Sequence, residues 1–310
     1  MNLNSKIYVA GHLGLVGSAI CRELNLQGFT EVYTRTRQEM DLLDNMAVQS
    51  FFEREKPKYV FMAAAKVGGI WANNNHPVNF LLENLQIQTN ILQAAHQHAV
   101  KKLIFLGSSC IYPKFAPQPL KEEYLLTGSL EPTNEWYAVA KIAGIKLCQA
   151  YQQQYNCNFI SAMPTNLYGP YDNYDLKGGH VLPALIRKFH DAKLRGDSEV
   201  SCWGTGSPLR EFLYSDDLAR ALLFLMKNYS NEQFINVGSS VEITIKNLAK
   251  LVREIIGFKG KINWNTSEPD GTPRKLMDSS RIFSLGWQPQ VGLREGISLA
   301  YDDFKKNYTN

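Results

Sequence analysis

The chain has 310 residues, of which 45% are hydrophobic and 20% charged, so it is neither disordered nor too small for one large α/β unit with a smaller appended lobe. Its net charge of +4 is spread along the chain without a block of lysine or arginine, which favours small anionic ligands at least as well as nucleic acid. The five cysteines are widely spaced without a CxxC pair, so we expect free thiols and no bound metal.

Strands and helices are expected to alternate through the first half of the chain. The first apolar run, Ile7–Ala10, begins after six residues and meets glycines at once, too short for a signal-peptide core or a membrane span, which predicts a cytoplasmic protein. Further strands are expected at Val32–Tyr33, Tyr59–Met62, 103–106 and 159–162, with amphipathic helical patterns between them. This alternation predicts a Rossmann-type doubly wound parallel sheet covered by helices on both faces.

The second half is expected to be a smaller α/β lobe that binds the substrate. From residue 167 onward, loops rich in Gly, Asn and Asp separate shorter elements at Glu199–Trp203, 234–237 and a final helix near 293–306. We therefore expect one domain at 1–166 and a lobe at 167–310. The segment 210–225 resembles another strand-helix unit, so residues near 205–240 are expected to rejoin the main sheet.

A glycine loop follows the first strand. Gly11, Gly14 and Gly17 precede an apolar-periodic helix, where glycine permits a tight turn and the helix N-terminus offers unpaired N–H groups to a pyrophosphate. A plain strand-helix turn is the alternative, but the position at the first junction favours a dinucleotide site. At the end of the second strand, Arg35 and Arg37 stand where an acidic residue would bind the ribose of NAD, so they favour NADP(H) unless they are only solvated surface arginines.

A tyrosine and a lysine carry the first catalytic signal. Tyr137 and Lys141 are four residues apart in a helical pattern and so share one face, where the ammonium is expected to lower the pKa of the phenol and make it a general acid. Such a pair is often an ordinary helix face. Here, however, Gly107-Ser108-Ser109 ends the preceding strand at the carboxyl edge, where doubly wound sheets bind ligands, so Ser108 is placed to share a substrate carbonyl with Tyr137.

Two further residues are ambiguous on spacing alone. Cys110 follows Ser109 directly, and a free cysteine is more often a small buried apolar group than a reactive one. His180, in Gly178-Gly179-His180, precedes an apolar-periodic helix and is more often a polar residue of a loop or helix N-terminus.

Together these motifs resemble the GDP-L-fucose synthase family of extended short-chain dehydrogenase/reductases over nearly the full chain. The glycine loop and the Tyr-Lys pair are shared by all extended reductases. The more specific features are the Gly-His histidine, Ser108-Ser109-Cys110-Ile111-Tyr112-Pro113 and Pro269-Asp270-Gly271-Thr272-Pro273-Arg274-Lys275. The other segments that carry the resemblance are Ala63-Ala64-Ala65-Lys66-Val67-Gly68-Gly69-Ile70, Glu131-Pro132-Thr133-Asn134-Glu135, Pro164-Thr165-Asn166-Leu167-Tyr168-Gly169-Pro170 and Arg210-Glu211-Phe212.

The resemblance implies a bifunctional GDP-4-keto-6-deoxy-D-mannose 3,5-epimerase and NADPH-dependent 4-reductase that gives GDP-L-fucose. Cys110 would remove the hydrogens at C3 and C5, which the C4 ketone acidifies, and His180 would return protons from the opposite face. Ser108 and Tyr137 would hold the charge on the ketone oxygen as an oxyanion hole does. Tyr137 would then protonate that oxygen, and Lys141 would orient the nicotinamide ribose.

The resemblance also implies two sets of binding residues. The GDP-sugar would be held by Lys188, Trp203, Arg210, Asp270 and Lys275. NADP(H) would be held by Gly11, His12, Leu13, Gly14, Leu15, Val16, Gly17, Arg35, Arg37, Leu106, Gly107, Ser108, Ser109, Lys141, Pro164, Thr165, Asn166, Leu167 and His180. In one departure, Leu13 stands where an arginine often helps to hold the 2′-phosphate, so a preference for NADPH would rest on Arg35 and Arg37.

Several alternatives remain open. A related GDP-4-keto-6-deoxy sugar such as a heptose is an alternative substrate, and a single-activity reductase or another nucleotide-sugar epimerase or dehydratase is an alternative enzyme. The presence of both Cys110 and His180 argues against reduction alone. A non-catalytic dinucleotide-binding protein is less expected, because such relatives tend to lose the tyrosine. Extended reductases often form homodimers through two helices, here 77–98 and 138–155.

Overall fold

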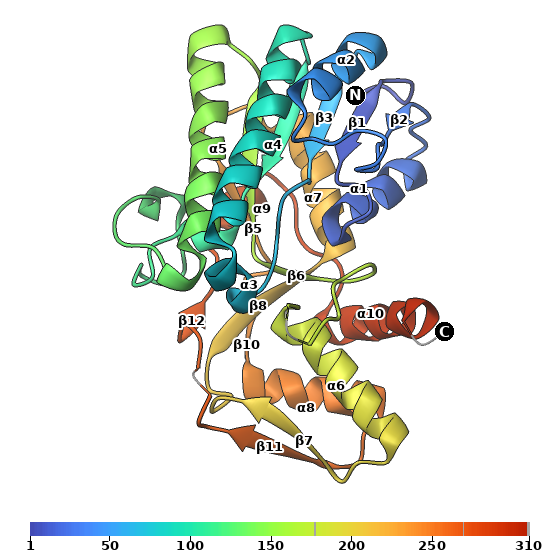
Figure 1. Ribbon diagram of the computed structural model, residues 1–310, viewed down its shortest axis with the longest axis vertical. Coiled ribbons are helices and arrows are strands. Elements are labelled where there is room, and N and C mark those ends of the chain that lie inside the picture. The colour runs from blue at the N-terminus through green and yellow to red at the C-terminus, as the bar shows by residue number, and fades with distance from the viewer. Residues whose placement is uncertain (177, 269, 309–310) are drawn as a thin grey trace.

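The computed structural model describes residues 1–176, 178–268 and 270–308, and the chain forms an upper and a lower part as seen in Figure 1. The upper part is built on a parallel sheet whose described strands lie in the order β2-β1-β3-β4-β5-β9. Their bounds are β1 (Ile7–Ala10), β2 (Val32–Tyr33), β3 (Tyr59–Met62), β4 (Lys102–Leu106), β5 (Phe159–Pro164) and β9 (Ile235–Val237). The strand order reverses between β1 and β3, and doubly wound sheets bind ligands at the carboxyl ends of strands at such a point.

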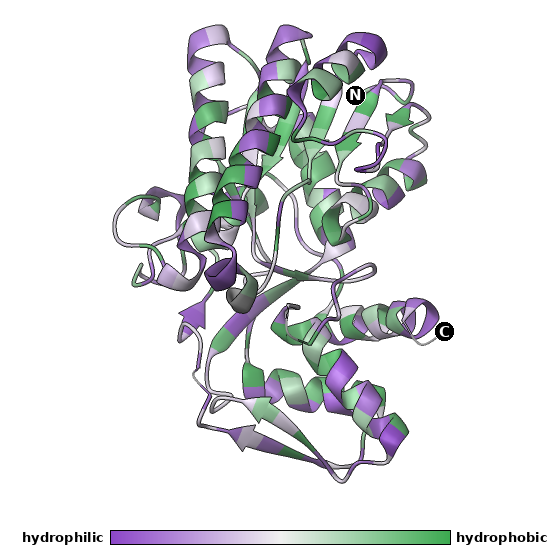
Figure 2. Cartoon of the chain, viewed as in Figure 1, coloured by the Kyte–Doolittle hydropathy of each residue, from purple (hydrophilic) through white to green (hydrophobic). Residues whose placement is uncertain are grey.

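Helices cover both faces of this sheet, as expected from its continuous apolar strands. Ile7 and Val9 point to one core and Tyr8 and Ala10 to another, and all four are fully buried. The first core includes α1 (Leu15–Leu26) and α7 (Ser215–Asn228), and the second includes α2 (Asn45–Glu55), α4 (Pro77–Gln97) and α5 (Glu135–Tyr155). Figure 2 shows the strands as largely hydrophobic, whereas the helices carry both polar and apolar residues. The predicted fold class is confirmed.

The lower part has its own core between small sheets and helices. β8 (Leu209–Tyr214) pairs with β10 (Glu242–Thr244), β12 (Arg274–Lys275) and β6 (Asn166–Tyr168), and β7 (Glu199–Trp203) pairs with β11 (Lys261–Asn265). The packed helices are α6 (Val181–Arg195), α8 (Ile245–Ile256) and α10 (Leu293–Asn307). Short helical turns link the larger elements: α3 (Ile70–Asn75), α9 (Ser280–Ser284), η1 (Ser109–Ile111), η2 (Glu122–Tyr124) and η3 (Pro132–Asn134).

The segment 210–225 differs from expectation in one respect. It does form a strand and a helix, and α7 packs against α1 on the main sheet, but β8 does not join that sheet. The edge of β5 is occupied by β9, through the pair Ala162 and Ile235, while β8 finds its backbone partners in the lower part. The strand that returns to the main sheet is therefore β9.

Neither a membrane-spanning helix nor a metal-binding cluster is found among the described residues. No helix in the ranges 1–176, 178–268 and 270–308 is long and apolar enough to cross a membrane. Within the same ranges, His, Cys, Asp and Glu side chains do not gather in threes as a metal site would require.

Candidate active site

The glycine loop has the geometry of a phosphate cradle. Gly11 has a φ of +84°, and a Cβ there would lie 2.8 Å from the backbone of Ala64, beyond the end of β3. A Cβ on Gly17 would lie 2.1 Å from the carbonyl oxygen of Gly11. Gly14 precedes α1 and provides no side chain to cap it, so the first N–H groups of the helix are left for an anion. These close approaches fit a dinucleotide pyrophosphate.

The two arginines after β2 are not equally available. Arg35 donates to Glu55 at 3.0 Å and lies 5.1 Å from the ring centroid of Phe51, so its guanidinium is already engaged. The Arg37 side chain is 70% exposed and has a long, 3.4 Å contact with Asp41. Leu13 is 67% exposed on the same loop as Gly11. Arg37 is therefore the more available of the two predicted cations for a 2′-phosphate.

Tyr137 and Lys141 share one face of α5, as predicted. The Lys141 ammonium lies 5.7 Å from the centroid of the Tyr137 ring and 4.8 Å from that of Phe105, and it donates to the carbonyl oxygen of Leu106 at 2.8 Å. Its side chain is 3% exposed, and this burial lowers the pKa of Lys141 to about 8. The hydrogen bond to Leu106 anchors the lysine at the carboxyl end of β4.

The pKa of Tyr137 is shifted in the direction opposite to the expected one. Burial raises the pKa of the phenol well above 10, and the neighbouring Cys110 raises it further. The lysine ammonium is directed to a backbone carbonyl rather than to the phenol oxygen. The phenol of Tyr137 is therefore protonated near neutral pH, which is the form that an acid needs.

Cys110 lies within the short turn η1, next to the end of β4. The Oγ of Ser108 accepts a hydrogen bond from the Cys110 amide at 3.4 Å and so holds the start of this turn. The Cys110 side chain is buried, which raises the pKa of its thiol, while the positive charge of Lys275 opposes that shift most strongly. Ser108, Cys110, Tyr137 and Lys141 thus meet at one end of the main sheet.

His180 approaches this cluster from the lower part. It occupies the residue before α6 and makes no capping hydrogen bond through its side chain. Burial lowers the pKa of the imidazole, and the Lys275 charge lowers it further, although solvent still reaches the ring. Lys275 is close enough to influence both His180 and Cys110, so both residues lie within electrostatic range of the same ammonium.

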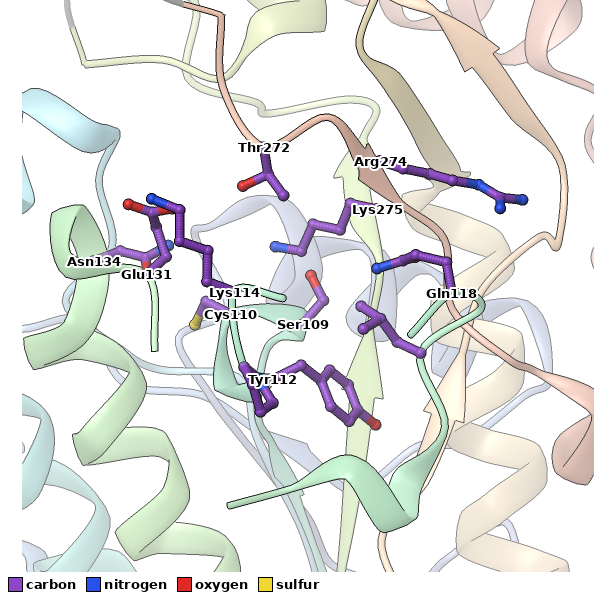
Figure 3. A pocket seen from close by; sticks show the side chains of 12 residues that line it. Ser109, Cys110, Tyr112, Lys114, Gln118, Glu131, Asn134, Thr272, Arg274 and Lys275 are labelled. Atoms are coloured by element: carbon purple, nitrogen blue, oxygen red, sulfur yellow. The ribbon is translucent and has the colours of Figure 1, made fainter. Parts of the chain in front are cut away.

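Figure 3 shows a cavity beside Cys110 in which Lys275 and Ser109 point toward one another. Lys114 and Glu131, which form an ion pair at 3.0 Å, lie across it with Asn134. Sequence patterns alone predicted no role for these three residues. Two of them, Glu131 and Asn134, do lie in one of the segments that resemble the GDP-L-fucose synthase family.

The residues predicted to hold the substrate form two groups joined by Asp270. Arg210 of β8 is paired in register with Lys275 of β12. Asp270 accepts hydrogen bonds from the backbone N–H and the hydroxyl of Thr205, two residues after Trp203. Trp203 is 62% exposed, and the Lys188 ammonium lies 5.5 Å from its ring centroid. Pro269, which begins this motif, lies outside the described residues.

The other residues predicted to hold the cofactor follow adjacent strands. The carboxyl end of β4 consists of Leu106, followed by Gly107 and the turn that begins at Ser108. The carboxyl end of its neighbour β5 consists of Pro164, followed by Thr165. Asn166 and Leu167 begin β6 directly afterwards, and the Asn166 amide donates to the Glu211 carbonyl at 2.8 Å. The carboxyl ends of β1, β4 and β5 therefore present one continuous edge to a cofactor.

Comparison with known proteins agrees with this geometry. Residues 7–238 match the model of the NAD dependent epimerase/dehydratase family. GDP-L-fucose synthase 1 of Arabidopsis thaliana is 61% identical over 307 residues, which cover 99% of this chain and 95% of the relative. Two solved structures superpose with a TM-score of 0.93. A GDP-L-fucose synthetase from Naegleria fowleri bound to NADP is 31% identical and aligns over 100% of this chain and 97% of its own. A GDP-6-OMe-4-keto-L-xylo-heptose reductase from C. jejuni is 40% identical and aligns over 99% of both chains.

Proposed function

The chain belongs to the NAD dependent epimerase/dehydratase family, in its GDP-L-fucose synthase branch, and from that premise we propose that it converts GDP-4-keto-6-deoxy-D-mannose into GDP-L-fucose. It would invert C3 and C5 and then reduce C4 with NADPH. One observation carries the proposal: a thiol and a phenol lie together at the end of the main sheet, and the positive charge of Lys275 acts on both that thiol and an imidazole of the lower part. Reduction alone would not need the thiol and the imidazole.

The inversion uses Cys110 and His180. The C4 carbonyl acidifies the neighbouring C–H bonds, so the Cys110 thiolate takes the proton and the electron pair moves to the carbonyl oxygen. Ser108 and Tyr137 donate hydrogen bonds to that oxygen while it carries the charge. His180 then delivers a proton to the opposite face of the carbon. The positive charge of Lys275 favours the thiolate form of Cys110, because it opposes the effect of burial.

Reduction uses Tyr137. When bound, NADPH supplies the hydride that adds to C4, and Tyr137 gives its proton to the C4 oxygen. Burial keeps the phenol protonated until that moment. We propose that Lys141, which is fixed by the Leu106 carbonyl and lies near the Tyr137 ring, binds the nicotinamide ribose and stabilises the phenolate left behind.

The cofactor would lie along the edge formed by the glycine loop and the ends of β4 and β5. Gly11 to Gly17 would hold the pyrophosphate and Arg37 the 2′-phosphate, with Arg35 behind it. The lower part would hold the GDP-sugar: Arg210 and Lys275 suit its diphosphate, and Trp203 with Lys188 offers an exposed surface for the nucleoside. This assigns residues 1–166 mainly to the cofactor and 167–310 mainly to the substrate.

We further propose a cytoplasmic homodimer that pairs through α4 and α5. These two helices pack against each other, and their outer sides carry exposed apolar residues, Val78 and Leu82 on α4 and Trp136 and Val139 on α5. Burying such a surface between two copies would remove it from water.

A heptose substrate is the second candidate, because the C. jejuni heptose reductase superposes as well as the fucose synthetase does. The deciding experiment incubates the protein with GDP-4-keto-6-deoxymannose and NADPH or NADH, follows cofactor absorbance, and identifies the product by NMR. GDP-L-fucose formed faster with NADPH is the expected result. A product reduced without inversion would exclude the epimerase roles of Cys110 and His180, and turnover of the heptose alone would replace the hexose.

A further inference from the structure

A short segment after β3 connects the glycine loop to the loop that carries His180. We call residues 66–69 the strap. It follows Ala63 and Ala64, whose backbone packs against Gly11, and it leads into α3, which Figure 1 places at the junction of the two parts. The strap therefore starts at the floor of the cofactor site and ends beside the lower part.

Two buried asparagines hold the strap at its two ends. Asn84 of α4 accepts from the Lys66 amide at 2.9 Å and donates to the Lys66 carbonyl at 3.0 Å. Asn73 of α3 donates to the carbonyl oxygens of Gly68 at 2.9 Å and Gly69 at 3.1 Å. The two asparagine side chains are 2% and 3% exposed, respectively. Buried amides with several backbone partners fix a loop in one conformation.

The strap in turn holds the loop before His180. The Gly69 amide donates to the carbonyl oxygen of Gly178 at 3.1 Å, two residues before the histidine. Asp175 completes the turn, because it accepts from the amides of Gly178 at 2.6 Å and Gly179 at 2.8 Å. Space at this junction is tight, since a Cβ on Gly69 would lie 3.2 Å from the Gly178 oxygen.

The remaining reacting groups have separate anchors. Lys141 is held by Leu106, Cys110 lies in the turn capped by Ser108, and Tyr137 belongs to α5 in the upper part. His180 alone is carried by a loop of the lower part. A change in the strap would therefore displace His180 relative to the other groups.

We propose that Asn73 is a positioning residue for the inversion step: it holds the strap that fixes the His180 loop, and hydride transfer does not depend on it. This inference rests on the proposed function. It predicts that the two steps respond differently: a displaced His180 delays the return of the proton during inversion, whereas the groups that carry out hydride transfer keep their positions. The ketone is then reduced before both centres have inverted.

The experiment compares Asn73→Asp with wild type and with Asn74→Asp, a change of the exposed neighbour on α3. An aspartate at position 73 keeps the size of the side chain but cannot donate to the two carbonyl oxygens. Each protein is given GDP-4-keto-6-deoxymannose and NADPH, and NMR measures the fraction of product that retains its original configuration at C3 or C5. Hydride transfer is measured separately, as the first turnover of GDP-L-fucose oxidation by NADP⁺.

For Asn73→Asp we expect the rate of inversion to fall roughly 10- to 100-fold, as for other small displacements of a reacting group, with first-turnover hydride transfer unchanged. The fraction of uninverted product rises accordingly, and Asn74→Asp behaves as wild type. Gly69→Ala would place a methyl group against the Gly178 carbonyl oxygen and so disturb the same contact between the strap and the His180 loop. It should also slow inversion and leave hydride transfer unchanged. This second variant keeps the inference testable if Asn73→Asp fails to fold. Equal losses of inversion and hydride transfer, or no loss of either, would overturn the inference. Failure of the proposed function is visible earlier, as reduction without inversion by wild type.

Discussion

The two sides of the cleft differ in how their functional residues are held. On the upper side, Cys110 is 7% and Lys141 3% exposed, and both are anchored where β4 meets α5. On the lower side, Trp203 is 62% exposed, and Lys188 contacts it across an open surface. Groups that transfer protons need fixed geometry and low solvation, whereas groups that collect a large anionic ligand need access. Changes of the upper-side reacting groups should therefore lower kcat, and changes of the lower-side residues that bind the GDP-sugar should raise KM.

The largest effect is expected from Tyr137→Phe. Removing the buried proton donor should slow hydride transfer by about 10²- to 10⁴-fold. Deuterium uptake from solvent at C3 and C5 should fall less, because Ser108 still supports the ketone oxygen. Absorbance of NADPH and mass spectrometry of the substrate measure the two rates. Tyr155→Phe, at the exposed end of the same helix, is the control. Equal loss of both rates would show that the phenol serves the two steps alike.

A lower-side change should act on binding instead. Arg210→Gln removes a partly buried cation that lies beside Lys275, and it should raise KM for the GDP-sugar by about 10- to 100-fold, the worth of a charge-assisted hydrogen bond. Steady-state kinetics should show little change in kcat. Arg195→Gln removes an exposed arginine paired with Asp197 and should change neither constant. A fall in kcat at constant KM would instead show that Arg210 acts with the reacting groups. The difference between the two sides of the cleft would then not hold.

The pH dependence of hydride transfer should report the buried lysine. Because the pKa of Lys141 is lowered to about 8, the ammonium is present below that pH and is lost as pH rises through it. The rate should therefore decline above pH 8, by up to about tenfold per pH unit. Lys141→Arg keeps its charge in this range, so any residual activity should lack the decline. The same decline in the arginine variant would assign it to another group.

The smallest effect is expected at the exposed cofactor rim. Leu13→Arg would add a cation at an exposed position on the glycine loop and raise the preference for NADPH over NADH by up to about fivefold, the upper value for an exposed ion pair. The ratio of kcat/KM for the two cofactors measures it. Leu26→Arg adds the same charge at an exposed position on α1 and should leave the ratio unchanged.

Much of the fold was predictable because it depends on local patterns. The strands β1 and β3 begin and end where the apolar runs do, since a strand buried on both faces is continuously hydrophobic. β8 was assigned to the wrong sheet because its partners, β10, β12 and β6, come from distant parts of the chain. The pattern of hydrophobic residues along a strand indicates whether the strand is buried, but it does not indicate which strand lies beside it.

The site shows the same division. The sequence by itself determined the glycine loop, the shared helix face of Tyr137 and Lys141, and the position of Cys110 after a buried strand, because each follows from spacing within one element. Only the tertiary structure decided that burial raises the pKa of Tyr137, that the charge of Lys275 acts on both Cys110 and His180, and that Asn73 holds the strap. These features depend on desolvation and on hydrogen bonds between segments far apart in the chain. Their energies exist only once the two parts have packed together, and no local pattern encodes them.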